Sequence, residues 1–354
     1  MSGKGRQITH KNHYVPRFYL KLWSTNGHSV QIYDCIVSRE HVKTWATGAI
    51  SRTACWDDLY TNRVYGEDDD KFERLMERAF ETPAKPVFDK VKCGAAINDE
   101  DMAILVNYLI AQLVRTPAWF LNIQKVYEEI AEPVIAEVIK DTLIDYDNGT
   151  LTSSNSDRMP RLYEPFGTSL KSDIDVRGNE VTVTVETYYG RRQFLNNAWR
   201  CITGRVGDHL RSQNWRLFDV PQGYELFASD NPVAIIGFRG NEMSIGANLG
   251  VGVDKVVVAM PVTPRHLLAT QVGLSRVEMD ALRLGDQLFS QFQRASIENA
   301  TRYVYAPKPS RLVEKVRPRT IDSEYYEFIS GARKLWGKEQ DTVEDYFDNS
   351  SKEG

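Results

Sequence analysis

The sequence predicts an α+β protein in which an N-terminal strand meander is followed by a helical middle and a C-terminal part of mixed strands and helices. Three observations predict this class. Apolar and polar side chains alternate near residues 29–34, helical apolar periodicity runs between residues 72 and 134, and short apolar runs return after residue 180. This order differs from the regular strand–helix alternation of a parallel α/β fold.

The composition is typical of a globular protein. The 354 residues are 42% hydrophobic and 26% charged, and the formal net charge of −4 does not require a polyanionic partner. The four cysteines are far apart, which favours reduced thiols over a zinc knuckle or a disulfide framework. We find neither an apolar leader nor an apolar run of the ~18–20 residues that a membrane span needs. We therefore expect a soluble, cytoplasmic protein with no membrane partner.

The N-terminal elements follow from local patterns. Residues 29–34 alternate and residues 41–45 do so more loosely, which predicts a short strand meander. The acidic run at 67–70 is expected to open an amphipathic helix, because its charge favours the positive end of the helix dipole. Pro83 and Pro86 are expected to break or kink this helix.

The helical middle has the clearest pattern. Asn98 is a predicted N-cap, and the apolar positions that follow it form one helical face. Thr116 and Pro117 end this helix and begin the next, because threonine caps a helix and proline suits its first position. Gln112 and Arg115 lie on a second stripe beside the apolar face, where a purely solvated surface would rather carry lysine and glutamate.

The remaining chain alternates between loops, strands and helices. Residues 145–179 are weakly patterned, and we interpret them as a loop or mobile insertion. We expect one large domain over residues 1–310, then a C-terminal helix and a frayed acidic tail within 311–354. Helices are predicted at 194–210 and 275–299, and strands at 181–185, 215–220, 224–227, 233–238, 255–260, 266–271 and 302–305.

Six segments carry a resemblance to a known family. They are HYVPRFYL at 13–20, CWDDLYT at 55–61, QLVRTP at 112–117, ASDNPV at 228–233, PVTPRHLL at 261–268 and NATRYVYA at 299–306. In this order they resemble domain-of-unknown-function family 4238, uncharacterised bacterial proteins with an N-terminal HYVPxFYL signature. The resemblance implies no particular fold, reaction or cofactor. The recurring polar residues of that family match this chain at His13, Tyr14, Gln112, Arg115, Asp230 and Asn231.

Each of the candidate polar residues has two interpretations. His13 is either a general base or ligand, or a histidine held by hydrogen bonds. Gln112 and Arg115 share a helical face, so they either bind an anion together or anchor the helix end through an arginine–carboxylate pair, with Asp230 as one partner. Asp230 with Asn231 is either a metal or base site at a strand end, or a turn whose aspartate binds nearby amides.

Two functions from different classes are consistent with these residues. The first is a metal-assisted phosphate-ester hydrolase acting on a nucleotide or nucleic acid, with Mg²⁺ or Mn²⁺ as cofactor. The second is a non-catalytic binding or sensing protein in which the same polar residues form a buried network. An open pocket shared by these residues would favour the enzyme, and a sealed, mutually bonded set would favour the second. In the enzyme the predicted catalytic residues are His13, Arg115 and Asp230, the substrate-binding residues are Arg17, Gln112 and Asn231, and the metal ligands are Asp230 and Glu81, with Glu73 and Glu77 as further carboxylates.

Overall fold

The computed structural model describes residues 8–149, 165–167, 169–177, 180–239, 242–246, 250–282 and 285–350. The protein is α+β, as the sequence predicts. N-terminal strands are followed by a helical middle and then by mixed strands and helices. Within the described residues no single helix combines the length and the apolar content of a membrane span, and the helices Asp99–Val114 and Pro117–Asp147 reach them only jointly, across a bend of 58°.

Most of the described helices are short, and Pro117–Asp147 and Ser323–Ser350 are the two long ones among them. Two 3₁₀ turns, η1 (Lys21–Trp23) and η2 (Ile50–Arg52), and one π-helical turn, η3, accompany them. In chain order the helical segments are α1 (Arg17–Leu20), α2 (Lys71–Leu75), η3 (Met76–Glu81), α3 (Thr82–Lys92), α4 (Asp99–Val114), α5 (Pro117–Asp147), α6 (Arg191–Thr203), α7 (Arg205–Arg211), α8 (Arg276–Ala281), α9 (Asp286–Glu298), α10 (Arg311–Val316) and α11 (Ser323–Ser350).

The strands form two larger antiparallel sheets and several pairs. The five-stranded sheet has the order β10 (Arg216–Asp219), β15 (His266–Gln271), β14 (Val257–Thr263), β12 (Ala234–Arg239), β13 (Glu242–Ile245). The four-stranded sheet has the order β11 (Ala228–Ser229), β16 (Tyr303–Ala306), β2 (Ser29–Asp34), β4 (Trp45–Ala49). The two-stranded pairs are β1 (Lys11–His13) with β5 (Cys55–Asp57), β3 (Ile36–Val37) with β17 (Thr320–Ile321), β6 (Asn62–Val64) with β7 (Glu67–Asp69), and β8 (Leu170–Arg177) with β9 (Glu180–Thr187).

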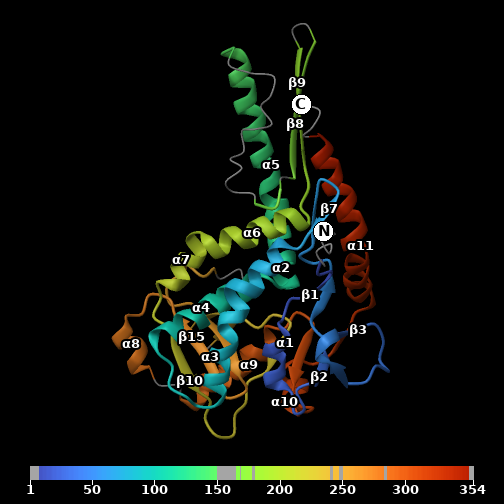
Figure 1. Ribbon diagram of the computed structural model, residues 1–354. Helices are drawn as coiled ribbons and strands as arrows, with labels where there is room; N and C mark the ends of the chain where they lie inside the picture. Colours follow the sequence, from blue (N-terminus) through green and yellow to red (C-terminus); the bar gives the residue numbers. More distant parts are fainter. Residues whose placement is uncertain are drawn as a thin grey trace, which may run out of the picture.

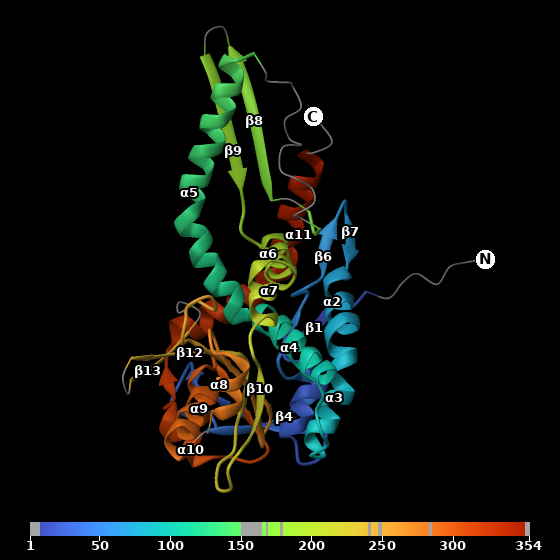
Figure 2. The same ribbon diagram turned by 90° about the vertical axis from the view of Figure 1, so that its left-hand side faces the viewer.

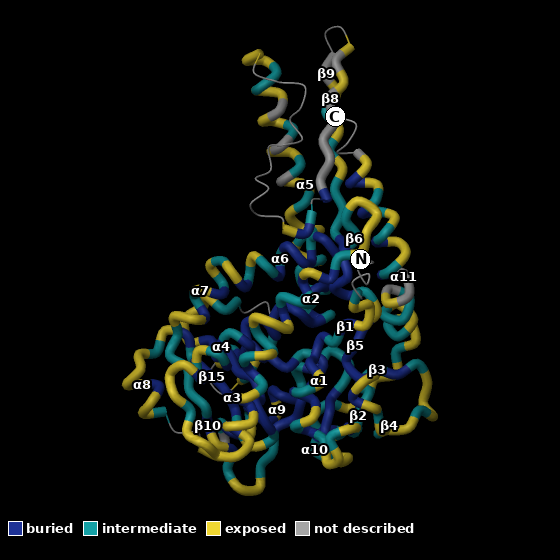
Figure 3. Tube along the Cα trace, in the orientation of Figure 1, coloured by how far each residue is buried: buried dark blue, intermediate teal, exposed yellow. Residues whose placement is uncertain are grey.

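The elements form a packed body with a projecting arm. Helix α5, the β8–β9 hairpin and helix α11 extend away from the body in two perpendicular views (Figures 1 and 2). The buried residues concentrate in the centre of the body, whereas α5 and α11 are largely half-buried or exposed where the structure describes their side chains (Figure 3).

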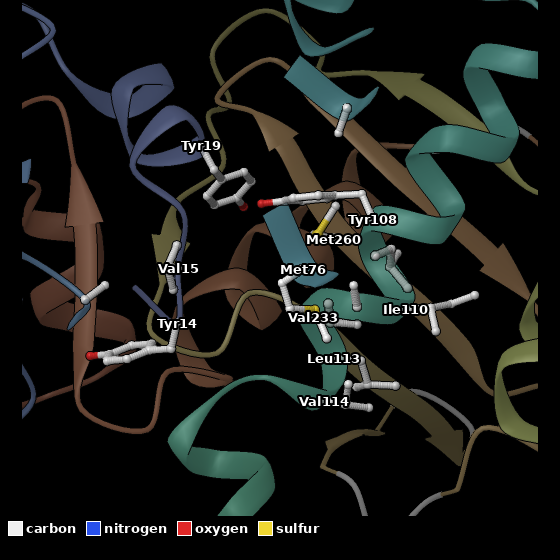
Figure 4. Close-up of a cluster of buried hydrophobic side chains, with 14 of the residues drawn as sticks. Tyr14, Val15, Tyr19, Met76, Tyr108, Ile110, Leu113, Val114, Val233 and Met260 are labelled. Atoms are coloured by element: carbon white, nitrogen blue, oxygen red, sulfur yellow. The ribbon is translucent and has the colours of Figure 1, made fainter. Parts of the chain in front are cut away.

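The five-stranded sheet separates two hydrophobic cores. Successive residues of β14 alternate between them, because side chains along a strand point to opposite faces. Val258 and Met260 join the main core with the N-terminal segment and α3, α4 and α6, whereas Val257 and Ala259 pack toward α8 and α9. Figure 4 shows part of the main core, including Met260.

The N-terminal segment is part of the main core. Tyr19 and Trp23 are fully buried, and their side chains donate to the carbonyl oxygens of Pro261 and Leu226. The rings of Tyr19 and Tyr108 lie 6.3 Å apart (Figure 4). These contacts explain why an aromatic-rich sequence stands so close to the chain terminus.

Several N-terminal boundaries differ from the prediction. The second meander strand begins at Trp45 and not at residue 41, because the carbonyl oxygens of residues 42–44 accept hydrogen bonds from Arg319. The acidic run at 67–70 forms strand β7 and the turn after it, and the helix begins only at Lys71. Pro86 lies inside α3, and the wide turn η3 directly precedes that helix.

The helical middle agrees with the prediction. The side chain of Asn98 accepts from the amide of Asp101 in a capping box, and Thr116 Oγ1 accepts from the amide of Trp119 at the start of α5. Helix α5 continues to Asp147, however, and residues 170–177 form strand β8. The loop predicted at 145–179 is therefore wrong at both ends, and residues 150–164 of it lie outside the described residues.

The C-terminal half contains four further differences. The helix expected at 194–210 is divided at Gly204, and the one expected at 275–299 is divided after Ala281. Residues 224–227 form no strand, because the amide of Leu226 binds the carbonyl of Pro264 and β10 pairs with β15 instead. The tail expected to fray is helical through Ser350.

Candidate functional site

The side chains of Gln112 and Arg115 bind the main chain of the N-terminal segment. Gln112 Nε2 donates to the carbonyl oxygen of Tyr14 at 2.7 Å, and Arg115 Nη2 donates to that of His13 at 2.6 Å. The segment reaches them because β1 pairs with β5, which places His13 opposite Cys55. The second stripe of α4 thus anchors the N-terminal segment.

Arg115 is the centre of a buried ion pair. Its side chain is 1% exposed, and its Nη1 lies 2.7 Å from Glu81 Oε1. Its carbonyl oxygen accepts a hydrogen bond from the Tyr60 hydroxyl, and the Tyr60 ring centroid lies 5.6 Å from the guanidinium carbon. The carboxylate that pairs with Arg115 is therefore Glu81 and not Asp230, because Asp230 binds other partners.

The His13 imidazole lies beside this ion pair. Burial, together with the positive charges of Arg17, Lys11 and Arg115, lowers its pKa to about 4. Its Nε2 is buried and makes no hydrogen bond within the described residues. The imidazole is therefore neutral at neutral pH. Its role as a general base stays a prediction.

Glu73 on α2 is a second perturbed group near Arg115. Burial, opposed by the charge of Arg115 and assisted by Glu81 and Glu77, raises its pKa to about 7. Its Oε2 is buried and makes no hydrogen bond among the described residues. The turn η3, which separates Glu73 from Glu81, is π-helical, a geometry frequent at functional sites. Such perturbed groups occur both in functional sites and in structural ion-pair networks.

Asp230 joins two segments that are distant in the sequence. Its Oδ1 accepts from the amide of Thr301 at 2.8 Å, and its Oδ2 accepts from those of Arg302 and Tyr303 at 2.8 and 3.0 Å. Burial raises its pKa to about 6, against the effect of these three hydrogen bonds. The turn interpretation expected nearby amides as its partners, but the amides belong to the two residues before β16 and to its first residue.

Asn231 and Asn299 connect the same two segments reciprocally. Asn231 Nδ2 donates to the carbonyl oxygen of Asn299 at 3.2 Å, and Asn299 Nδ2 donates to those of Asn231 and Val233 at 2.5 and 2.9 Å. The segment at 229–233 and the segment at 299–303 are therefore held together by side chains from both sides.

An open cavity of about 530 Å³ borders these two segments. Asn231 is the predicted site residue that lines it, beside Asn299 and Thr301. Its other walls come from the start of α5, from β12 and from the start of α11. Among the side chains that they contribute are Trp119, Asn122, Lys125, Val233, Ile235, Tyr325 and Phe328.

Sequence reasoning missed the aromatic and basic groups of this cavity. Trp119 is the third residue of α5, and its indole Nε1 is buried without a hydrogen-bond partner within the described part of the chain. Tyr325 and Phe328 come from α11, far along the chain, and their ring centroids lie 6.5 Å apart. The sequence feature that could have identified Trp119 is its position in the first turn of the helix predicted to start at Thr116 and Pro117.

The predicted site residues therefore form two groups, with Tyr14 between them. The carbonyl of Tyr14 binds Gln112, and the pKa of its phenol is raised by burial and by the charge of Asp230. No contact joins Arg115 to Asp230 in the described residues. The first group is His13, Arg17, Gln112 and Arg115, and the second is Asp230 and Asn231.

The predicted metal ligands are engaged in other contacts. Asp230 binds three backbone amides, and Glu81 binds Arg115. Among the residues that the structure describes, no group of three or more histidine, cysteine, aspartate or glutamate side chains is arranged to hold a metal ion. The predicted Mg²⁺ or Mn²⁺ site therefore has no support in the described part of the chain.

The fold and these contacts define an α+β protein with a buried polar cluster under its N-terminal segment and an open cavity beside Asn231. Residues 11–310 match the family described as "Protein of unknown function (DUF4238)", and the chain belongs to this family, as its motifs predict. No curated protein and no solved structure matches the chain.

Proposed function

We propose that this protein binds a small planar heteroaromatic ligand of nucleobase type in the cavity beside Asn231. The observation that carries the proposal is the buried indole Nε1 of Trp119, which has no hydrogen-bond partner within the described residues. A buried donor without a partner is unfavourable by about 1–3 kcal/mol, so a turn of the indole that brings Nε1 to a ligand acceptor in the cavity relieves this cost.

The other walls suit the same ligand. Trp119, Tyr325 and Phe328 supply aromatic surface, and Asn122 and Asn231 supply amide groups that can pair with the edge of a base. The volume of about 530 Å³ lies within the roughly 300–1,000 Å³ typical of small-molecule sites. The exposed Lys125 lines the same cavity and favours a ligand that carries a phosphate.

We rank binding above phosphate-ester hydrolysis because two of the predicted catalytic side chains, Arg115 and Asp230, are occupied by protein contacts. Arg115 binds Glu81 and the carbonyl of His13, and Asp230 binds three amides. Neither Arg115 nor Asp230 borders the cavity. The hydrolase stays a prediction, and it calls for an access route to His13 that the cavity beside Asn231 does not provide.

Isothermal titration calorimetry tests the proposal. The probes are adenosine, guanosine, cytidine, uridine and their 5′-monophosphates, titrated into the full chain. At least one probe is expected to bind with a stoichiometry of one. Trp119→Phe removes the indole donor and is expected to weaken that binding roughly three- to tenfold.

Trp199→Phe is the matched control, because Trp199 packs against the main core and does not border the cavity. It is expected to bind the probe as the unmodified protein does. Absence of binding by every probe, or equal weakening in both variants, would contradict the proposed function.

A further inference from the structure

The cavity has a polar wall built from two segments that are joined by the β11–β16 pairing, by the amide of Asp230, which donates to the carbonyl oxygen of Tyr303, and by side chains. Asn231 belongs to the first segment and Thr301 to the second, and both border the cavity. Asp230 is 6% exposed and stands directly beside Asn231. Its carboxylate accepts from the amide of Thr301 at 2.8 Å and from the next two amides along the chain. Beyond the end of the strand pairing, this buried carboxylate is the group that fixes the amides of residues 301–303 beside Asn231.

We infer that Asp230 is the positioning residue of the ligand cavity, acting through the amides of residues 301–303 and touching no ligand itself. This inference rests on the proposed function, since it assigns a role within that same site. Its geometric basis is that three consecutive N–H groups converge on two oxygen atoms. Only a carboxylate offers acceptors to all three without presenting a donor.

The second segment has a further anchor in Arg317, whose charge also acts on Asp230. Arg317 Nη1 donates to the carbonyl oxygen of Glu298 at 2.5 Å, and its Nη2 donates to that of Thr301 at 3.5 Å. Asp230 thus binds the amides of residues 301–303, and Arg317 binds the carbonyl of Thr301. Removal of the carboxylate leaves the carbonyl anchor in place, so we expect a local displacement of residues 301–303 and not the loss of the fold.

Substitution by asparagine is informative because it preserves size. Asp230→Asn keeps one acceptor oxygen and replaces the other with an NH₂ group, which faces backbone donors. At least one of the three amide hydrogen bonds is then lost. Since hydrogen bonds to charged groups are stronger than neutral ones, we expect adenosine or the best nucleoside probe to bind roughly tenfold more weakly.

Protonation of Asp230 tests the same three hydrogen bonds without a mutation, because the O–H of the protonated carboxyl also faces a backbone donor. Affinity in the unmodified protein is expected to fall as the pH is lowered from 7.5 to 5, and in Asp230→Asn it is expected to be weak and flat. Nucleosides serve as probes because they do not titrate in this range. The charged or titratable groups that face Asp230 from the neighbouring elements are Arg317, Tyr14, Tyr303, Tyr305, Tyr325 and Cys35, and the pKa values of these phenols and of the thiol are raised away from this range.

The control variant is Asp208→Asn, since Asp208 is exposed on α7 and does not border the cavity. It is expected to reproduce the affinity and the pH profile of the unmodified protein. A flat profile in the unmodified protein, or unchanged affinity in Asp230→Asn, overturns the inference.

Hydrogen exchange of the amides of residues 301–303 separates this inference from the proposed function. In the ligand-free protein we expect these amides to lose protection in Asp230→Asn, after correction for intrinsic exchange rates. Lost protection together with no binding by any nucleoside supports the positioning contacts and contradicts the proposed ligand. Unchanged protection overturns the inference whether or not a nucleoside binds.

Discussion

Arg191 on α6 and Glu344 on α11 form a buried ion pair, with 2.7 Å between Nη2 and Oε2. Both side chains are almost fully buried, at 1% and 3% exposure. The same Nη2 lies 2.6 Å from Asp341, and the amide of Arg63 donates to Glu344. These contacts fix the C-terminal part of α11 to α6 and to the main chain at Arg63.

Arg191→Ala is expected to destabilise the protein by about 3–5 kcal/mol, because it leaves the buried carboxylate of Glu344 without its cation. Urea unfolding followed by circular dichroism measures the change. Arg294→Ala is the control, since Arg294 is 60% exposed and its pair with Glu298 is worth no more than about 1 kcal/mol. Equal losses in the two variants would contradict this account of α11.

The C-terminal tail shows what sequence patterns cannot predict. Its acidic residues are typical of a solvated, frayed end, yet Glu344 and Asp348 are buried. Their partners Arg191 and Arg192 lie about 150 residues earlier in the chain, at the start of α6. Local composition contains no information about such distant pairs, so the prediction of fraying is wrong up to Ser350, and residues 351–354 lie outside the described residues.

Local rules succeeded where the determining contacts are themselves local. The cap of Asn98 and the helix start at Thr116 depend on amides within three residues, and both were predicted. The stripe of Gln112 and Arg115 was also recognised as unusual, although its partners were not identified. Those partners, the carbonyls of the N-terminal segment and Glu81, become adjacent only through tertiary packing.

Arg115→Ala is expected to destabilise the protein by about 3–5 kcal/mol. The substitution leaves Glu81 without its cation and removes the hydrogen bond to the carbonyl of His13. Thermal denaturation measures the effect, and Arg17→Ala is the control because Arg17 is exposed. An unchanged midpoint for Arg115→Ala would show that the arginine does not anchor the N-terminal segment.

Glu73→Gln is expected to stabilise the protein at pH 8 more than at pH 5. Burial raises the pKa of Glu73 to about 7 from the model-peptide value of 4.5, so its native state prefers the protonated form. The penalty for the charged form is absent below about pH 4.5, grows as the pH rises, and is complete above about pH 7. Removal of the charge should therefore gain roughly 2–3 kcal/mol more at pH 8 than at pH 5.

Urea unfolding at the two pH values measures this difference. Glu129→Gln is the control, because Glu129 is exposed on α5, and this substitution is expected to change stability by no more than about 0.5 kcal/mol. A gain for Glu73→Gln that is the same at pH 5 and pH 8 would show that Glu73 is not buried as an isolated carboxyl.

Lys125→Gln tests whether the proposed ligand carries a phosphate. Lys125 is exposed at the wall of the cavity, so its ammonium group is expected to favour a nucleoside monophosphate over the corresponding nucleoside by about two- to fivefold, the range of an exposed ion pair. The variant should remove this preference and leave nucleoside binding unchanged. Lys140→Gln, an exposed lysine farther along α5, should retain it.

Because salt screens exposed charges, the preference for the monophosphate should also decline between 50 mM and 500 mM NaCl, measured by calorimetry. A preference that persists in Lys125→Gln would mean that another group of the cavity recognises the phosphate.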